Sequence, residues 1–174
     1  YGRSRPTVAN ACVTPIVLGF LAYVGVSLCA LGLACGLFVM HSGGCLVSTG
    51  FARDYPVRII DSGPAAGVLM GAAVGLSEGV EHIITFDMGG TTAKLGAVDG
   101  GAPAIMPTFE VGHVRYKKGS GLPINVPSVE LLEICAGGGS IARVGLGMIG
   151  VGPECAGADP GPTCAGQGGG RYSS

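Results

Sequence analysis

Apolar residues dominate the first part of the chain. No Lys, Arg, Asp or Glu lies between Arg5 and Arg53, and residues 16–40 are almost wholly apolar. This run is longer than the ~20 residues that a helix needs to cross a bilayer, but glycines interrupt it and no cationic cluster follows it. The pattern therefore favours a helix over about 7–31 and a buried strand over 37–40. A membrane-tethered protein is the less favoured alternative.

Shorter apolar runs, separated by glycine and proline, follow in the rest of the chain. They predict, in order, a short helix at 48–55, a strand at 57–60, a helix rich in small residues from Pro64 to about Glu78, strands at 82–87, 92–98 and 108–116, and a segment at 126–134 that leads into three glycines. Loops and short strands are expected after that. Alternation of helices and strands indicates the α/β class.

The composition is that of a folded protein of ordinary size. The 174 residues suffice for one domain with a core, and 48% hydrophobic against 12% charged residues exclude disorder from low hydrophobicity. A net charge of −1 gives no electrostatic footprint for nucleic acid. We therefore expect no nucleic-acid partner.

The seven cysteines do not form a recognisable framework. Their number is odd, no Cys-x-x-Cys pair occurs and no secretory signal precedes them, so neither a disulfide framework nor a structural zinc site is expected. We expect a cytoplasmic protein in which most cysteines are small buried hydrophobic residues. The exposure of Cys164, in a loop rich in Gly and Pro, is left open.

The strongest chemical signal is the stretch Phe86–Lys94, which follows an apolar run and contains an acid, two glycines and two threonines. The acid at the end of the strand can hold Mg²⁺ directly or through water. The glycines lack Cβ, so their N–H groups can approach phosphate oxygens closely, and the threonines add hydroxyl donors. The hairpin is expected to turn again at Asp99–Gly100. The candidate site residues are Asp87, Gly89, Gly90, Thr91, Thr92 and, as a counter-charge, Lys94.

An ordinary tight turn between two strands has the same pattern, so two further segments bear on the phosphate role. In Asp61–Gly67 a helix N-terminus can hold an anion, or it can simply be capped by Asp61 or Ser62. Three consecutive glycines in Ile134–Ala142 cost roughly 0.5–1 kcal/mol each against alanine inside regular structure. They favour a backbone that borders a nucleotide, although a hinge, or tight packing of one sheet on another, would also require glycine at these positions. The candidates there are Gly137, Gly138, Gly139 and Ser140.

Other polar positions carry weaker signals. His41 follows the expected strand at 37–40, where it serves either as a structural hydrogen-bonding group or as a ligand. A basic loop at 117–121 is either a solvated turn or reaches toward a carboxylate substrate. Glu130 and Glu133 are interpreted as ordinary charged positions on a half-exposed strand.

Together these segments resemble the hydantoinase A/5-oxoprolinase family, whose members include N-methylhydantoinases, 5-oxoprolinases and acetone or acetophenone carboxylase subunits. The likeness extends over nearly the whole chain, through Thr7–Ala11, Leu37–Gly44, Ser62–Gly67, Phe86–Lys94, Gly137–Ala142, Val151–Glu154 and Ala156–Pro162. The resemblance implies part of an actin-like ATPase fold of the ribonuclease H-like kind, with a mixed sheet and flanking helices.

The resemblance also implies chemistry. ATP and Mg²⁺ are the expected cofactors, with Asp87 as the catalytic and metal-holding residue, Gly89 to Thr92 around the β- and γ-phosphates, and Gly137 to Ser140 beside the adenosine. Phosphorylation of a carbonyl oxygen then leads to the opening of a cyclic amide, such as a hydantoin or 5-oxoproline. An ATP-dependent ketone carboxylase subunit and a non-catalytic nucleotide-binding module are the alternatives. A hydantoinase B-type subunit or domain is the expected partner.

The chain departs from the family pattern in several places, among them the segment 163–165, where Thr-Cys-Ala replaces a more usual Ala-Cys-Tyr, and the first helix, which lacks a charged face. The family's other phosphate loop, an Asp-x-Gly-Gly-Thr motif near the N-terminus, is absent, so residues 1–174 are interpreted as an internal fragment of the ATPase domain. One half of the phosphate clamp is then missing, and we expect this fragment alone to hydrolyse ATP poorly or not at all. Cys135 stands where the family usually has glycine.

Overall fold

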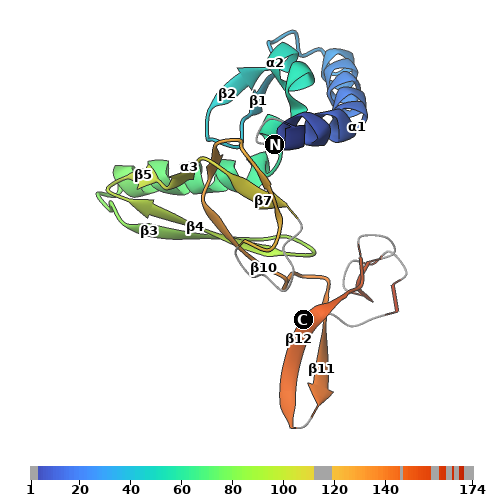
Figure 1. The fold of residues 1–174 in the computed structure, drawn as a ribbon, viewed down its shortest axis with the longest axis vertical. Coiled ribbons are helices and arrows are strands. Elements are labelled where there is room, and N and C mark those ends of the chain that lie inside the picture. Colours follow the sequence, from blue (N-terminus) through green and yellow to red (C-terminus); the bar gives the residue numbers. More distant parts are fainter. Residues whose placement is uncertain are drawn as a thin grey trace. The chain divides into compact units, whose positions relative to one another are not determined.

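A computed structural model describes residues 4–111, 119–145, 147–157, 161–163, 166 and 169–170. Figure 1 labels the helices and strands of the chain. The chain divides into two compact units. Unit 1 contains residues 1–83 and 97–130, and unit 2 contains residues 84–96 and 131–174.

Unit 1 begins with the long helix α1 (Ser4–Ala30), which confirms the helix expected over 7–31. Apolar residues surround α1 on every side, yet Leu21 is the only one of its residues that is buried. By length and composition α1 could cross a membrane, a test that core helices of soluble proteins and N-terminal signal sequences also pass.

Asn10 holds α1 against the two elements that follow in unit 1. Its Nδ2 donates to the carbonyl oxygen of Asp54 (3.1 Å), the last residue of α2 (Thr49–Asp54). Its Oδ1 accepts from the N–H of Val57 (3.1 Å) in the 3₁₀ helix η1 (Pro56–Ile59). One side-chain amide therefore satisfies a backbone acceptor and a backbone donor where α2 meets η1.

The short helix expected at 48–55 is confirmed by α2, whose first turn is capped by the hydroxyl of Ser48. The strand expected at 57–60 is wrong, because η1 occupies this segment. Pro56 begins η1 at the position where a fixed φ and a missing N–H cost nothing. A short apolar run alone does not distinguish a strand from a helical turn.

β1 (Phe38–Met40) and β2 (Leu46–Ser48) form an antiparallel pair. The pair confirms a strand after α1, but the expectation that this strand is buried is wrong. A sheet of two strands leaves most of its surface open, and Phe38 is 62% exposed.

The expected burial of the cysteines is also wrong. Four of them are exposed and two are half-buried: Cys12, Cys29, Cys35 and Cys45, then Cys135 and Cys155. The first two belong to α1, which buries little of its apolar surface. Cys164 lies outside the described residues.

α3 (Ser62–Ser77) confirms the helix rich in small residues. Its buried positions recur every three or four residues and so lie on one face: Ala65, Val68, Ala72 and Gly75. Asp61 precedes the helix in the left-handed conformation (φ 58°, ψ 22°), and its side chain makes no capping hydrogen bond. Side-chain capping by Asp61 is therefore not observed.

Short antiparallel pairs and a small core complete unit 1. β4 (Ala93–Asp99) pairs at its end with β5 (Ala102–Pro103), β6 (Ile105–Met106) with β9 (Ser128–Val129), and β7 (Phe109–Val111) with β8 (Leu122–Ile124). One cluster of its core consists of Val57, Phe109, Ile124 and Val126. Strand β7 confirms the start of the strand expected at 108–116, and residues 112–116 lie outside the described ones.

The turn after β4 lies one residue later than expected. Asp99 pairs with Ala102, so Gly100 and Gly101 form the two-residue loop. Both have positive φ, 57° and 76°, which is the requirement of the turn that matches the twist of a hairpin.

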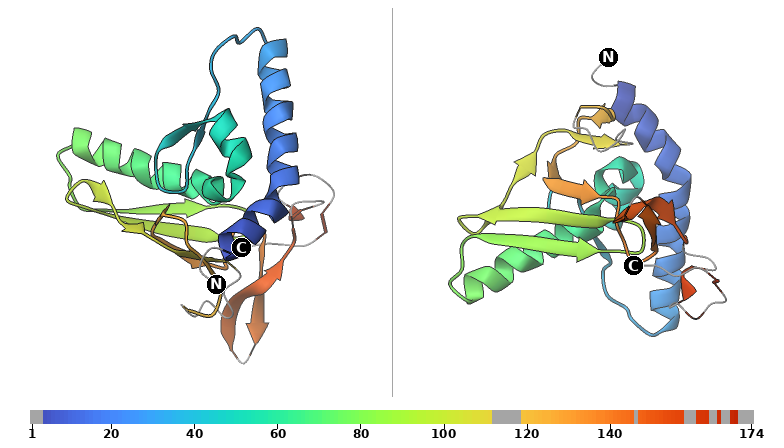
Figure 2. Two further views of the ribbon diagram at one scale, coloured as in Figure 1. Left: turned by 45° about the horizontal axis from the view of Figure 1, so that its top comes forward. Right: turned by 90° about the horizontal axis from the view of Figure 1, so that it is seen from below.

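Unit 2 contains most of β3 (Ile83–Met88), the first half of β4 and the whole of β10 (Leu131–Ile134). The strand order β10-β4-β3 leaves β3 at an edge. A hairpin of β11 (Ser140–Gly145) and β12 (Met148–Cys155) follows (Figure 2). It is longer than the short strands expected in this part of the chain.

Candidate functional site

The loop Gly89–Thr92 joins the two strands of the predicted phosphate hairpin, β3 and β4. The N–H of Gly89 donates to the carbonyl oxygen of Thr92 (3.0 Å), which closes the loop. The hydroxyl of Thr85 donates to the carbonyl oxygen of Gly96 (3.2 Å) and joins the strands further back. Asp87 is exposed, one residue before the end of β3.

The structure brings this loop together with the triple glycine, about fifty residues later in the sequence. The N–H of Gly138 donates to the carbonyl oxygen of Gly89 (3.0 Å), and the N–H of Gly139 donates to that of Gly90 (2.6 Å). Of the three motifs identified in the sequence, the loop after β3 and the triple glycine are therefore joined by backbone hydrogen bonds within unit 2.

Close packing gives a sufficient reason for glycine at two of these positions. A Cβ on Gly137 would lie 2.7 Å from backbone atoms of Gly90 and Thr91. A Cβ on Gly139 would lie 2.9 Å from the carbonyl oxygen of Gly90 and 3.0 Å from the sulfur of Cys155. The alternative of tight packing thus explains Gly137 and Gly139 without a ligand, and the contact of the triple glycine with adenosine remains a prediction.

Ser140 closes the glycine turn from within. Its Oγ accepts from the N–H of Gly137 (2.8 Å), and its own N–H donates to the carbonyl oxygen of Gly137 (2.9 Å). Ser140 is 2% exposed, so its hydroxyl has a structural partner in the interior.

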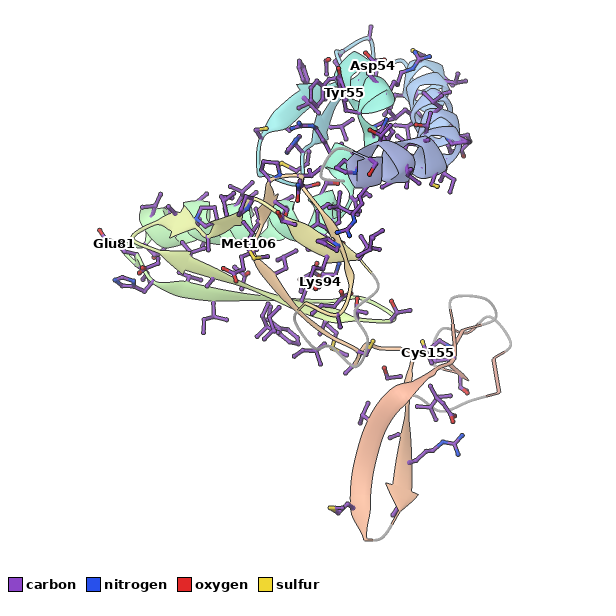
Figure 3. The ribbon with its side chains drawn as sticks, in the orientation of Figure 1. Asp54, Tyr55, Glu81, Lys94, Met106 and Cys155 are labelled. Atoms are coloured by element: carbon purple, nitrogen blue, oxygen red, sulfur yellow. The ribbon has the colours of Figure 1, made fainter. Side chains whose placement is uncertain are left out.

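Lys94 has a partner that sequence reasoning did not predict. The antiparallel register places Glu133 of β10 opposite Lys94, and Lys94 Nζ lies 3.8 Å from Glu133 Oε1. The side chain of Lys94 is 15% exposed. Figure 3 labels this residue. Its charge is balanced within the sheet, and a role toward phosphate remains a prediction.

Cys155 is the second residue that sequence reasoning missed. It ends β12, where its sulfur lies 3.8 Å from the carbonyl oxygen of Gly90 and accepts from the N–H of Gly157 (3.4 Å) (Figure 3). Its sequence neighbourhood, rich in Gly and Pro, carries no signal of this contact.

Opposite charges on adjacent strands could have suggested the pair of Lys94 and Glu133, but only once the register was known.

The groups that remain available suit a magnesium–phosphate ligand. Among the described residues, the hydroxyls of Thr91 and Thr92 and the carboxylate of Asp87 have no hydrogen-bond partner. A Cβ on Gly90 would meet no atom within 4 Å, so the space beside it is open. Mg²⁺ is typically held by one or two carboxylates together with phosphate oxygens and water. The described residues contain no cluster of three or more metal-binding side chains, and this mode of binding needs none.

The other candidates belong to unit 1. His41 and Ser42 are buried, with 6% and 1% exposure. The Ser42 hydroxyl lies 2.7 and 2.5 Å from the carbonyl oxygens of Arg58 and Ile60, which makes this loop a structural junction. A shallow depression lined by Leu18, Gly50, Arg53 and Asp54 contains no predicted site residue. The basic residues 117 and 118 lie outside the described ones.

Comparison with solved structures supports the expected fold. The crystal structure of ATP-dependent caprolactamase from Pseudomonas jessenii matches 99% of this chain and 24% of its own, with a TM-score of 0.67 and 32% identity. A nucleotide-free acetone carboxylase matches 88% of this chain and 20% of its own, with a TM-score of 0.69 and 24% identity, which shows the fold alone. The chain therefore has the mixed α/β fold of the actin-like ATPase type, here with its strands in several sheets.

Comparison of sequences agrees. The chain is 34% identical to caprolactamase subunit alpha of Pseudomonas jessenii, over 97% of this chain and 23% of that protein. It is 30% identical to 5-oxoprolinase 1 of Arabidopsis thaliana, over 96% of this chain and 12% of that protein. The chain thus spans a quarter or less of the length of these relatives. Residues 3–173 match the model of the hydantoinase/oxoprolinase family, and the chain belongs to this family.

Proposed function

We propose that this chain supplies the phosphate- and magnesium-binding part of an ATP-dependent hydrolase of cyclic amides. The observation that carries the proposal is the joined arrangement of the two glycine motifs. Among the described residues, the side chains of Asp87, near the end of the edge strand β3, and of Thr91 and Thr92, in the loop after it, have no protein partner. One carboxylate and two hydroxyls are therefore available to a metal ion and to phosphate oxygens.

In this proposal each group has one role. Asp87 holds Mg²⁺, while the backbone N–H groups of the loop and the hydroxyls of Thr91 and Thr92 hold the β- and γ-phosphates. Gly138 is the half-exposed member of the glycine turn, so we place the contact with adenosine there. Bound Mg–ATP supplies a phosphoryl group that activates the carbonyl oxygen of the substrate.

The choice of a cyclic amide over a ketone follows from the relatives. Identity to the caprolactamase structure is 32%, against 24% to acetone carboxylase. A caprolactamase acts on a cyclic amide, as does a 5-oxoprolinase, so both named relatives above 25% identity support this class. The word subunit in the name of the caprolactamase relative supports a second subunit, for which we propose the hydantoinase B type. The six described cysteines are free thiols, in keeping with a cytoplasmic location.

The test is the substitution Asp87→Asn in the full-length protein. Removing the carboxylate charge should weaken Mg–ATP binding by at least about tenfold, equivalent to about 1.4 kcal/mol, and abolish ATP-dependent amide hydrolysis. Calorimetric titration and a product assay measure the two effects. Asp54→Asn is the matched control, since Asp54 contributes only its backbone carbonyl to a described hydrogen bond.

Two outcomes count against the proposal. Unchanged Mg–ATP affinity in Asp87→Asn removes this carboxylate from the nucleotide site. Loss of nucleotide affinity with full product formation instead favours a non-catalytic nucleotide-binding module.

A further inference from the structure

We infer that the glycine clasp, defined as Gly137, Gly138, Gly139 and Ser140, positions the loop Gly89–Thr92 so that two consecutive backbone N–H groups face the phosphates. The inference rests on the proposed function and assigns a further task to residues that the sequence suggested as nucleotide contacts. In this role the clasp acts through the loop rather than on the ligand.

The first step concerns the direction of the peptide groups. The clasp donates to the carbonyl oxygens of Gly89 (3.0 Å) and Gly90 (2.6 Å). In a planar trans peptide the C=O and the following N–H point in opposite directions. Because these two carbonyls point at the clasp, the N–H groups of Gly90 and Thr91 point away from it.

The second step concerns what those two N–H groups meet. Within the described part of the chain neither has an acceptor, and a side chain added at Gly90 would meet open space. Successive N–H groups that face one side form a concave site for anions. The hydroxyls of Thr91 and Thr92 adjoin the same stretch of backbone, so the clasp orients the donors that a phosphate needs.

The third step concerns how the clasp keeps its own shape. The Ser140 hydroxyl holds the N–H of Gly137 in the interior (2.8 Å). Gly137 packs so closely on Gly90 and Thr91 that a Cβ would lie 2.7 Å from their backbone atoms. Cys155 approaches the carbonyl oxygen of Gly90 from β12 (3.8 Å). The loop is therefore restrained from several sides before any ligand binds.

The experiment uses Gly137→Ala in the full-length protein, with Gly145→Ala as the matched control. Gly145 lies in β11, and a Cβ there would meet no atom within 4 Å. Hydrogen exchange by mass spectrometry reports on peptides over 86–95 and 135–141, and titration gives the Kd for Mg–ATP. We expect faster exchange in both peptides and a Kd raised on the order of 10- to 100-fold in Gly137→Ala, with neither change in Gly145→Ala.

A second, milder variant keeps the inference testable if Gly137→Ala does not fold. Ser140→Ala removes the acceptor of the Gly137 N–H but adds no atom, so exchange should rise at 135–141 and the Kd should rise in the same direction. Ser140→Thr keeps a hydroxyl and should restore part of the affinity. Uniformly faster exchange, including the β11–β12 hairpin, would show general destabilisation and overturn the inference.

Failure of the inference differs from failure of the proposed function. If Gly137→Ala loosens the two peptides but binds Mg–ATP normally while Asp87→Asn does not, the positioning role is wrong and the proposed function stands. If Asp87→Asn binds Mg–ATP with unchanged affinity, the proposed function is wrong, and the positioning role fails with it.

Discussion

His41 lies in the interior of unit 1, where its ring serves as a hydrogen-bond acceptor. The side chain is 6% exposed, and its Nδ1 accepts from the N–H of Gly43 (2.8 Å). Burial lowers the pKa of His41 below its usual 6.5, and the charge of Arg58 lowers it further. The ring of Phe51, on α2, is its described aromatic neighbour. A proton on Nδ1 would remove the acceptor of the Gly43 N–H.

This environment predicts an acid-sensitive unit 1. The folded-state pKa of His41 lies below the unfolded value of 6.5, so the unfolded chain binds more protons below that pH. The contribution of His41 to stability is complete above pH 6.5 and is lost as the pH falls toward the folded-state pKa. We expect a lower urea midpoint in acid, measured by circular dichroism.

The control separates His41 from other titrating groups. His41→Gln should lose this part of the acid sensitivity. His82→Gln should retain it, because His82 is an exposed residue that pairs with Asp99 (2.6 Å). Identical pH profiles for His41→Gln and the unmodified protein would assign the effect elsewhere.

At the scale of elements, α3 offers a matched pair of glycines. A Cβ at Gly67 would meet no atom within 4 Å, whereas a Cβ at Gly75 would overlap the side chain of Ile83 and lie 2.7 Å from the carbonyl oxygen of Val80. Gly67→Ala should therefore stabilise the protein by roughly 0.5–1 kcal/mol through helix propensity. Gly75→Ala should destabilise it by about 1–3 kcal/mol through overpacking.

Urea denaturation measures both changes. Stabilisation by both alanines would show that the helix end beside Gly75 relaxes freely. Destabilisation by Gly67→Ala would indicate that another group lies against this exposed position.

The elements that sequence predicted well are those defined by local pattern. α3 follows from small residues with apolar spacing, and the β3–β4 hairpin follows from two apolar strands around a glycine loop. The segment at 57–60 was misassigned because four apolar or mixed residues fit η1 as well as a strand. Local pattern therefore identified the elements of the candidate site but not every neighbour.

The contacts that sequence did not predict depend on distant parts of the chain. Glu133 meets Lys94 only because β10 pairs with β4 in one particular register. The reason for Gly137 lies in the backbone of Gly90 and Thr91, and Cys155 approaches the same carbonyl from β12. None of these pairings follows from spacing along the sequence, since each needs the folded path of the backbone.

At the scale of the whole molecule, the two units divide the predicted residues between them. Unit 2 contains the loop and the clasp, and unit 1 contains α1, α3 and the His41 loop. Each unit has its own means of fixing backbone groups: Asn10 and Ser42 in unit 1, and Ser140 in unit 2. Where the strands are short, small polar side chains thus provide hydrogen-bond partners for backbone N–H and C=O groups.

The relation of the protein to membranes is a property of the whole molecule, and it depends on α1. The helix runs from Ser4 to Ala30, and its side chains near the start include Asn10, which binds backbone groups of α2 and η1. Leu21 is buried as well, so if these contacts are kept, only residues 22–30 of α1 are free to leave unit 1. That part is about 14 Å long at 1.5 Å per residue, much shorter than the ~30 Å hydrocarbon core.

We therefore expect the full-length protein to remain in the supernatant after membrane fractionation and a carbonate wash. Asn10→Leu is the informative variant, because it frees the start of α1 from its two backbone partners and lengthens the apolar segment that is available. Asn125→Leu serves as the control, since the one described side-chain hydrogen bond of Asn125 is exposed: its Oδ1 accepts from the hydroxyl of Thr108 (3.1 Å). Recovery of the unmodified protein in the carbonate-resistant pellet would mean that α1 leaves Asn10's partners and spans the bilayer, against this expectation.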